Sequence, residues 1–239
     1  MAALAGVTAA FLLLLFLMPD LGPLFAWGFP DVVPPIYRFE SFPRLFLAHA
    51  EIVAASSLAS IAAALVLGVF VTRPAGREFR ALLGAVAAIG QSIPPVAVLA
   101  IAVPMLGYGL APTFLALAIY GFLPIVANVI AGIENVPAAV REAAEGMGLS
   151  PLQILRKVEL PLAAPVILAG IRISVVINIG TATIGSTVGT VTLGTPIISG
   201  LVGDKLPYVI EGASLVGLFA IATDMALGRL ERRWRARAE

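Results

Sequence analysis

The sequence predicts an all-α, polytopic membrane protein with about six transmembrane helices. Hydrophobic residues make up 60% of its 239 residues and charged residues 12%, about half the charged share of ordinary soluble domains. Runs without any charge recur along the chain and are long enough to cross a bilayer. A chain of this size cannot hide so much apolar surface in one core, so we expect much of it to face lipid.

The charge-free runs place the individual spans, since a spanning helix needs about 20 mainly apolar residues. We expect spans at residues 1–19, 52–72, 165–187 and 206–227, with two more inside residues 81–133. A turn at residues 104–112, which contains Gly107 and Gly109, separates these last two. The first run lacks the preceding Lys or Arg of a secretory signal peptide, so a retained helix is favoured; cleavage would leave five spans.

Basic residues are distributed unevenly between the loops, and this sets the expected orientation. Those that follow the second, fourth and sixth spans are Arg73, Arg77, Arg80, Arg141, Arg156, Lys157, Arg229, Arg232, Arg233, Arg235 and Arg237. The opposite side carries only Arg38, Arg44 and Lys205. We therefore expect a multi-pass protein of the inner (plasma) membrane with both termini in the cytoplasm.

Residues 134–163 form the longest loop on the expected cytoplasmic side and predict two short helices with a break. Good helix formers begin at Ala138, and Gly148 follows them as a helix-ending glycine. Ser150 then begins the second helix with a Ser-x-x-Gln capping box. Leu160 and Pro161 are expected to stop it. Two helices meeting at a glycine corner would form a rigid body that another protein can grip and move.

The same loop carries a spaced motif. It reads Glu142-Ala143-Ala144, three residues, Gly148, nine residues, then Val158-Glu159-Leu160-Pro161. This resembles the EAA motif of binding-protein-dependent ABC importer permeases, in which EAA, three residues, G and nine residues precede I-x-L-P. Only Val158 departs from that pattern, and it does so conservatively.

The resemblance implies a cytoplasmic coupling helix that docks on a separate ATPase subunit. Its residues would be Glu142, Ala143, Ala144, Gly148, Leu160 and Pro161. By this analogy the two alanines allow close approach, Gly148 makes the corner and Glu142 makes a polar contact. An ordinary helical hairpin between two spans is the alternative.

Three further segments extend the resemblance to the methionine-importer-like permease fold and, within it, to osmoprotectant permeases. Residues 49–73 look like the opening span of that fold. Gln91-Ser92-Ile93-Pro94-Pro95 is similar to Q-[ST]-I-P-[ST], and Ile179-Gly180-Thr181-Ala182-Thr183-Ile184 is similar to I-G-T-A-T-[IL]. The resemblance implies one permease domain over residues 1–239. Within it we expect an N-terminal helix and outer loop (1–47), a core fold (48–228), the EAA loop (134–163) and a basic tail (229–239).

The implied solutes are quaternary ammonium compounds such as glycine betaine, choline and carnitine. One departure bears on this: residues 189–194 read Gly-Thr-Val-Thr-Leu-Gly, where the osmoprotectant permeases have A-G-G-L-G and only the last Leu-Gly is in register. A permease of the same fold for methionine or another amino acid therefore stays open.

Polar residues within apolar runs need partners or a water-filled cavity. The set predicted to line the translocation path is Gln91, Asn178, Thr181 and Thr183. Pro94 and Pro95 must break backbone hydrogen bonds within a span, which makes that segment a candidate gate or a packing kink.

Other residues in the spans allow more than one interpretation. Gly185 and Gly189 have the spacing of close helix packing, either within the subunit or along the path and subunit interface. Arg172 is expected to snorkel, or to lie on a helix that extends below the membrane, rather than to line the path. His49 is expected at the outer surface. The aromatic residues of the loop 20–48 fit an interfacial belt better than a cage for a cation.

The composition excludes several kinds of site. The net charge of +1 gives no case for nucleic acid. The chain has no cysteine and one histidine, so thiolate or multi-histidine metal sites are excluded. No Walker A sequence G-x-x-x-x-G-K-[ST] occurs. We expect no catalytic residue, metal or cofactor, with ATP bound by a partner.

The resemblance supplies the expected partners: two cytoplasmic ATPase subunits, an extracytoplasmic binding protein, a second permease subunit (identical or similar) and membrane lipid. An autonomous channel or an intramembrane enzyme is the remote alternative, because neither explains the EAA loop.

Overall fold

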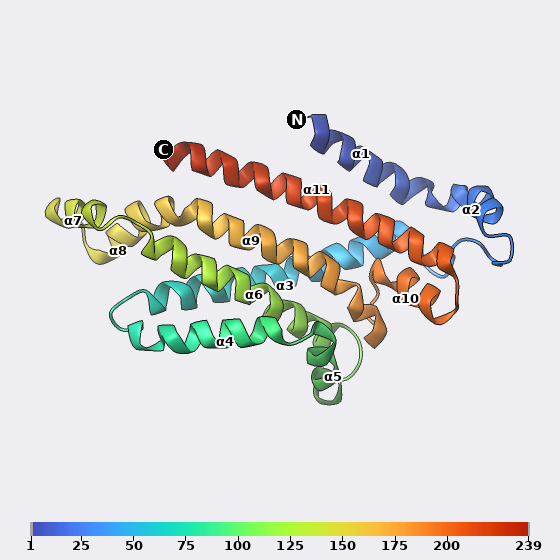
Figure 1. Cartoon of the computed structure of the whole chain (residues 1–239), viewed down its shortest axis with the longest axis horizontal. Helices are drawn as coiled ribbons and strands as arrows, with labels where there is room; N and C mark the ends of the chain where they lie inside the picture. The colour runs from blue at the N-terminus through green and yellow to red at the C-terminus, as the bar shows by residue number, and fades with distance from the viewer. Residues whose placement is uncertain (1, 239) are drawn as a thin grey trace.

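The computed structural model describes residues 2–238 and consists there of helices and their connections, without β-strands (Figure 1). In chain order the helices are α1 (Ala2–Leu17), η1 (Met18–Leu21), α2 (Gly22–Gly28), α3 (Phe42–Val71), η2 (Arg77–Phe79), α4 (Arg80–Ser92), α5 (Pro95–Leu106), α6 (Leu110–Glu134), α7 (Ala138–Gly146), α8 (Pro151–Ile154), η3 (Leu155–Glu159), α9 (Leu160–Ala182), η4 (Ile184–Val188), α10 (Gly194–Val202) and α11 (Leu206–Ala238). The short helices η1, η2 and η4 are 3-10 helices, whereas η3 is a π-helix.

Within the described range, five helical stretches are long and apolar enough to cross a membrane. They are Ala2–Gly28, Phe42–Val71, Leu110–Glu134, Pro151–Ala182 and Leu206–Ala236. A sixth stretch, Arg77–Ser92 followed by Pro95–Leu106, qualifies only as a pair of helices bent by 98°. The predicted all-α membrane architecture is confirmed, with the third predicted span bent.

Helices α3, α6 and α9 form the centre of the bundle, and small residues bring them close together. A Cβ added at Gly68 of α3 would lie 2.6 Å from a methyl group of Val129 on α6. One added at Gly170 of α9 would lie 2.6 Å from the Cβ of Asn128. Lipid tails are as apolar as these side chains, so close packing rather than hydrophobic burial holds such helices together.

Helix α11 packs on α9 from the outside, and α1 packs on α11 in turn (Figure 1). Aromatic rings join these layers: Phe11 of α1 lies 4.9 Å from Phe46 of α3 and 5.9 Å from Phe219 of α11, between ring centroids. The opposite side of α1 exposes Leu13 and Phe16. An exposed apolar face on a spanning helix is the expected lipid contact.

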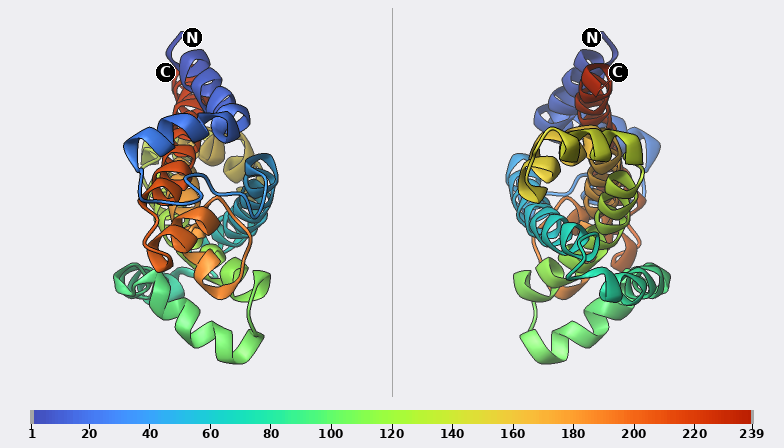
Figure 2. Two further views of the ribbon diagram at one scale, coloured as in Figure 1. Left: turned by 90° about the vertical axis from the view of Figure 1, so that its right-hand side faces the viewer. Right: turned by 90° about the vertical axis from the view of Figure 1, so that its left-hand side faces the viewer.

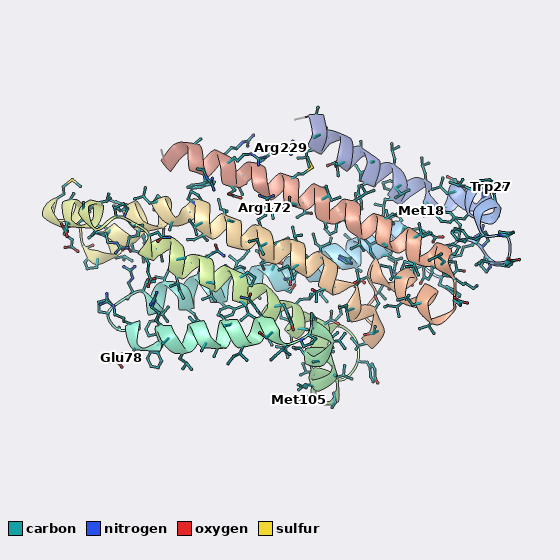
Figure 3. The ribbon with its side chains drawn as sticks, viewed as in Figure 1. Met18, Trp27, Glu78, Met105, Arg172 and Arg229 are labelled. Atoms are coloured by element: carbon teal, nitrogen blue, oxygen red, sulfur yellow. The ribbon has the colours of Figure 1, made fainter. Side chains whose placement is uncertain are left out.

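An ion pair links α9 to α11 where the sequence suggested a snorkelling arginine. Arg172, labelled in Figure 3, donates two hydrogen bonds to the carboxylate of Asp224, both of 2.7 Å, and Glu231 lies 3.4 Å away. Gly228 of α11 makes room, because a Cβ there would lie 3.1 Å from the guanidinium. The positive charge of Arg172 on α9 is therefore neutralised by a carboxylate of α11 and does not depend on contact with water alone.

The bend between α4 and α5 coincides with the predicted break at Pro94 and Pro95. Ile93 and Pro94 are extended, and Pro95 begins α5. Pro95 has no N–H to continue the hydrogen bonds of α4, and residues before proline disfavour helical angles. Helix α4 runs beside α6, whereas α5 packs on α6 and η4 through Leu99 and projects from one side of the bundle (Figure 2).

The two ends of the bundle are formed by different short helices. Helices α7 and α8 lie at one end, and α2 and α10 lie at the other (Figure 1). The first residues of α1 and the last residues of α11 both point toward the α7–α8 end (Figure 1).

Three expectations about individual segments are wrong. The fifth span ends at Ala182 rather than near Thr187, because the chain turns through η4. Its helix also begins well before Pro165, which lies inside α9. His49 is fully buried rather than at the surface: its Nε2 lies 3.1 Å from the Ile179 carbonyl, because α3 continues outward past it.

Candidate coupling site and translocation path

Gly148 forms the corner between α7 and α8 in the manner the sequence predicts. Its φ of +79° is in the left-handed region, where only glycine is free of strain. The N–H of Gly148 donates to Glu145 O (2.8 Å), and that of Leu149 donates to Ala144 O (3.2 Å). This pair of bonds is a Schellman motif, which satisfies the last carbonyls of α7 and turns the chain sharply.

The second helix begins with the predicted capping box. The main-chain N–H of Ser150 donates to Gln153 Oε1 at 2.8 Å, and Pro151 occupies the first turn. The Gln153 side chain therefore satisfies a backbone donor that a bare helix start would leave open. The turn and the cap together fix the angle between α7 and α8 through local bonds alone.

The expectation that Leu160 and Pro161 stop this helix is wrong. Residues Pro151–Ala182 form one continuous helical stretch, in which η3 is π-helical. The Leu160 N–H reaches back five residues to Leu155 O. This wider turn accommodates Pro161, which lacks an N–H and would crowd the carbonyl four residues earlier in a regular helix. Helix α8 is therefore joined to α9 without a break in the helical backbone.

The α7–α8 corner presents a partly apolar outer surface. Ala144 is buried against its own chain, whereas Glu142, Ala143 and Gly148 are exposed. Met147 is 74% exposed and Leu152 is 55% exposed, although this end of the bundle carries most of the basic residues. The outer surface of this corner therefore combines large apolar side chains with the polar Glu142.

The buried carboxylate of Glu159 connects the α7–α8 corner to the rest of the bundle. Glu159, at the x of the I-x-L-P pattern, is 3% exposed. It lies 2.7 Å from Arg73 at the end of α3 and 3.0 Å from Arg141 of α7. Arg141 also donates to the carbonyl of Ile133, at the end of α6. A charge this buried is stable only when paired, so Glu159 holds α3, α7 and the base of α9 together.

The sequence analysis did not predict the ion pairs of Glu159, although the position of this residue is unusual. Glu159 is a single acidic residue between an apolar helix and the basic residues Arg156 and Lys157. Its neighbours in space, Arg73 and Arg141, lie 86 and 18 residues away in the chain. A cavity of about 230 Å³ beside it is also lined by Arg80 and Glu134, which form an ion pair of 2.6 Å.

The residues predicted to line the path do not converge within one chain. Gln91 and Pro94 are exposed at the α4–α5 corner. Asn178 of α9 is fully buried against α3, where its Nδ2 donates to Ser57 Oγ at 3.2 Å. Thr181 and Thr183 are partly buried, and Thr183 donates to the Gly180 carbonyl of its own helix. The lining of the path stays a prediction.

The segment that departs from the osmoprotectant pattern forms a network of hydroxyl groups. Thr190 donates to Gly109 O (2.8 Å) and lies 2.7 Å from Thr113 Oγ1 of α6. Gly185 packs against Thr113, and a Cβ added there would lie 2.4 Å from its methyl group. Gly189 has a left-handed φ of +85° and makes a turn. The Gly185–Gly189 pair thus serves one packing contact and one turn within this chain.

The comparisons with known proteins agree with this geometry. The profile of the family described as binding-protein-dependent transport system inner membrane component matches residues 64–236. The osmoprotectant import permease protein OsmY of Salmonella typhimurium is 36% identical over 95% of this chain and 93% of its own length. The choline transport system permease protein OpuBB of Bacillus subtilis is 42% identical over 71% of this chain and 81% of its own.

A solved structure supports the same fold. A chain of the inward-facing MetNI methionine ABC transporter superposes with a TM-score of 0.72 at 24% identity, covering 80% of this chain and 95% of that one. The family match spans most of the chain and includes the α7–α8 corner, the Glu159 cluster and the bundle helices α6, α9 and α11. This protein therefore belongs to the inner-membrane components of binding-protein-dependent transport systems, as the permease subunit of an ABC importer.

Proposed function

We propose that this chain is the membrane-spanning subunit through which an ATP-driven importer moves quaternary ammonium osmoprotectants. Two cytoplasmic ATPase subunits would bind and hydrolyse ATP, a binding protein would deliver the solute outside, and a second permease subunit would complete the path. The observation that carries this is the α7–α8 corner, in which the EAA spacing, the left-handed Gly148 and the exposed Met147 occur together. The names of the relatives support the solute class, since one is an osmoprotectant and another a choline permease.

The coupling step follows from how this corner is built. An ATPase subunit that grips Met147, Ala143 and Glu142 would move α7 and α8 as one body, because the Schellman motif and the capping box fix their angle. The unbroken stretch from Pro151 would carry that movement into α9. Through Arg73, Glu159 would carry it into α3 as well.

The α4–α5 corner is the part of the chain that most needs a second subunit. Gln91, Ser92 and Pro94 are exposed there, at a break in the helical hydrogen bonds. Irregular backbone is not tolerated against lipid, only against protein or water. We place the gate and the translocation path at this corner, beside Pro95, with the second permease subunit facing it.

The orientation agrees with the same scheme. The basic end of the bundle, with α7, α8 and the C-terminal end of α11, would face the cytoplasm of a cell whose inner membrane holds the protein (Figure 1). The positive-inside rule favours that side for the arginines that follow α3, α6 and α11.

Solute-stimulated ATP hydrolysis tests the proposal. The permease would be reconstituted with the ATPase and binding protein encoded beside it, and betaine, choline, carnitine or methionine added in turn. We expect a quaternary amine to stimulate hydrolysis, and Gly148→Ala to lower the stimulation by imposing left-handed strain on alanine. Stimulation by methionine alone would keep the mechanism but reject the solute class. Failure of the ATPase to associate would reject the importer proposal.

A further inference from the structure

A large apolar groove opens on the outer half of the bundle and carries a single charge. Its volume is about 920 Å³, and residues of α3, the start of α6 and the turn after η4 line it. Phe114 and Leu115 of α6 form one wall, and Ala55 of α3 forms another. Among the described residues that line it, only Glu51 is charged. Glu51 is itself exposed.

The position of Glu51 along α3 places it at the outer mouth of the membrane. Helix α3 ends at Val71, beside the basic turn that contains Arg73. Twenty residues separate Glu51 from Val71, about 30 Å of helix, which equals the usual thickness of the hydrocarbon core. The groove thus opens toward the side from which a solute would be delivered.

Two polar groups beside the groove already have partners. Thr190 donates its hydroxyl hydrogen to Gly109 O, and the Gly109 N–H donates to Val188 O at 2.7 Å. The groove therefore offers a solute apolar walls, one aromatic ring and one carboxylate, with few free hydrogen-bond donors.

That combination matches one chemical class. A quaternary ammonium group carries a positive charge but no N–H, so it is recognised by apolar and aromatic contact together with a nearby negative charge. A primary ammonium would instead need several hydrogen-bond acceptors when it left water. The carboxylate of betaine or carnitine, which also needs hydrogen-bond partners, would stay in water at the mouth of the groove while the quaternary ammonium group enters. We propose that Glu51 provides the counter-charge for a quaternary ammonium group in this groove, as the solute enters the path. This deepens the proposed function and rests on it.

The absence of cysteine from the chain allows a direct test, because one introduced thiol is then the only one in this subunit. Ala55 lies four residues after Glu51 on the same face of α3 and lines the groove. Ala55→Cys would be assembled with the ATPase and binding protein. It would be treated with two methanethiosulfonate reagents, one bearing a trimethylammonium group and one bearing a sulfonate. Val202→Cys, 85% exposed at the outer end, provides the control site.

We expect Ala55→Cys to react about tenfold faster with the trimethylammonium reagent than with the sulfonate, relative to Val202→Cys, given one unit charge at this separation. Choline should slow that reaction. Adding Glu51→Gln should abolish both the charge preference and the choline protection, whereas Asp31→Asn in the exposed outer loop should leave them unchanged. Equal rates with both reagents, or protection that survives Glu51→Gln, would overturn the inference.

A parallel measurement separates this inference from the proposed function. If choline does not stimulate ATP hydrolysis by the unmodified complex, and no other quaternary amine does, the proposed function fails whatever the labelling shows. If stimulation is present but the labelling is indifferent to Glu51, only the role of Glu51 is rejected. A partner subunit or a lipid chain filling the groove would leave Ala55→Cys unreactive toward both reagents, which also rejects the proposal.

Discussion

Single charged residues in this protein are stabilised by neighbours from distant parts of the chain. Glu159 lies between Arg73 and Arg141, and its side chain is 5% exposed, whereas the two arginine side chains are 28% and 32% exposed. The arginines therefore keep some water, but the carboxylate depends on them. Removing one member of a buried ion pair costs more than the pair contributes, because the remaining charge loses its partner.

We predict that Glu159→Gln lowers stability and weakens coupling. It should cost about 1–3 kcal/mol, the usual penalty for an unsatisfied polar group, because the two arginines are partly hydrated. Glu134→Gln is the matched control, since Glu134 pairs with Arg80 in a more exposed setting (37% and 52%) and should cost under about 1 kcal/mol. Thermal unfolding in detergent and the number of solute molecules moved per ATP would measure both effects. Equal losses in the two variants would contradict a special role for Glu159.

The structural roles of residues that bond to their near neighbours in the chain were predictable from sequence. The roles of residues that contact distant parts of the chain were not. Gly148 and Ser150 form local bonds within a few residues, so a spacing rule found both. Glu159 and His49 are defined by contacts with other helices. No local pattern contains such contacts.

At the level of helices, close packing and paired charges hold the bundle together. Gly68 and Gly170 let α3, α6 and α9 approach, and the Arg172–Asp224 pair joins α9 to α11. The helix-breaking prolines were predictable because proline acts on its own backbone, and the bend at Pro94 and Pro95 followed. The π-helical turn before Pro161 was not predictable from the proline alone. It depends on the backbone geometry of residues 155–159, which accommodates the proline within a continuous helix.

We predict that Gly68→Ala separates α3 from α6. The added methyl group would lie 2.6 Å from Val129, so one helix must shift, at a cost of about 1–3 kcal/mol. Gly84→Ala on α4 is the control, because nothing lies within 4 Å of its Cβ position and alanine favours the helix. Thermal unfolding of the two variants in the same detergent provides the comparison. A Gly68→Ala protein as stable as Gly84→Ala would contradict the packing described.

We predict that the Arg172–Asp224 pair behaves as a unit. Asp224→Leu alone leaves Arg172 with only the longer 3.4 Å contact to Glu231, so it should destabilise the protein more than the double change Arg172→Leu with Asp224→Leu. In the double variant Glu231 keeps its 3.1 Å pair with Arg235. A double-mutant cycle of unfolding midpoints measures the coupling. Additive effects would show that the two residues act independently.

For the whole molecule, composition and charge pattern predicted the architecture, and the resemblance of the EAA motif predicted the family. The charge-free runs located five helical stretches that can cross a membrane, with the fifth predicted span shifted toward its N-terminal end. The third predicted span corresponds to a pair of helices bent by 98°. The EAA spacing predicted two helices with a glycine corner, which are α7 and α8, and the family match includes them. The path could not be located in this way, because its candidate residues, Gln91 and Asn178, lie apart in one chain. If two subunits form the path together, the sequence of one subunit does not show which of its residues face the other.

The central claim is that movement of the α7–α8 corner by an ATPase drives a quaternary amine through this subunit. ATP-dependent uptake of labelled choline into proteoliposomes tests it most directly, with Met147→Asp as the variant, because Met147 is 74% exposed and outside the folded core. We predict uptake by the unmodified complex and a loss of at least tenfold in the variant, with its thermal stability unchanged. Uptake that is equal in the variant, or absent from the unmodified complex for choline, betaine and carnitine alike, would contradict the account.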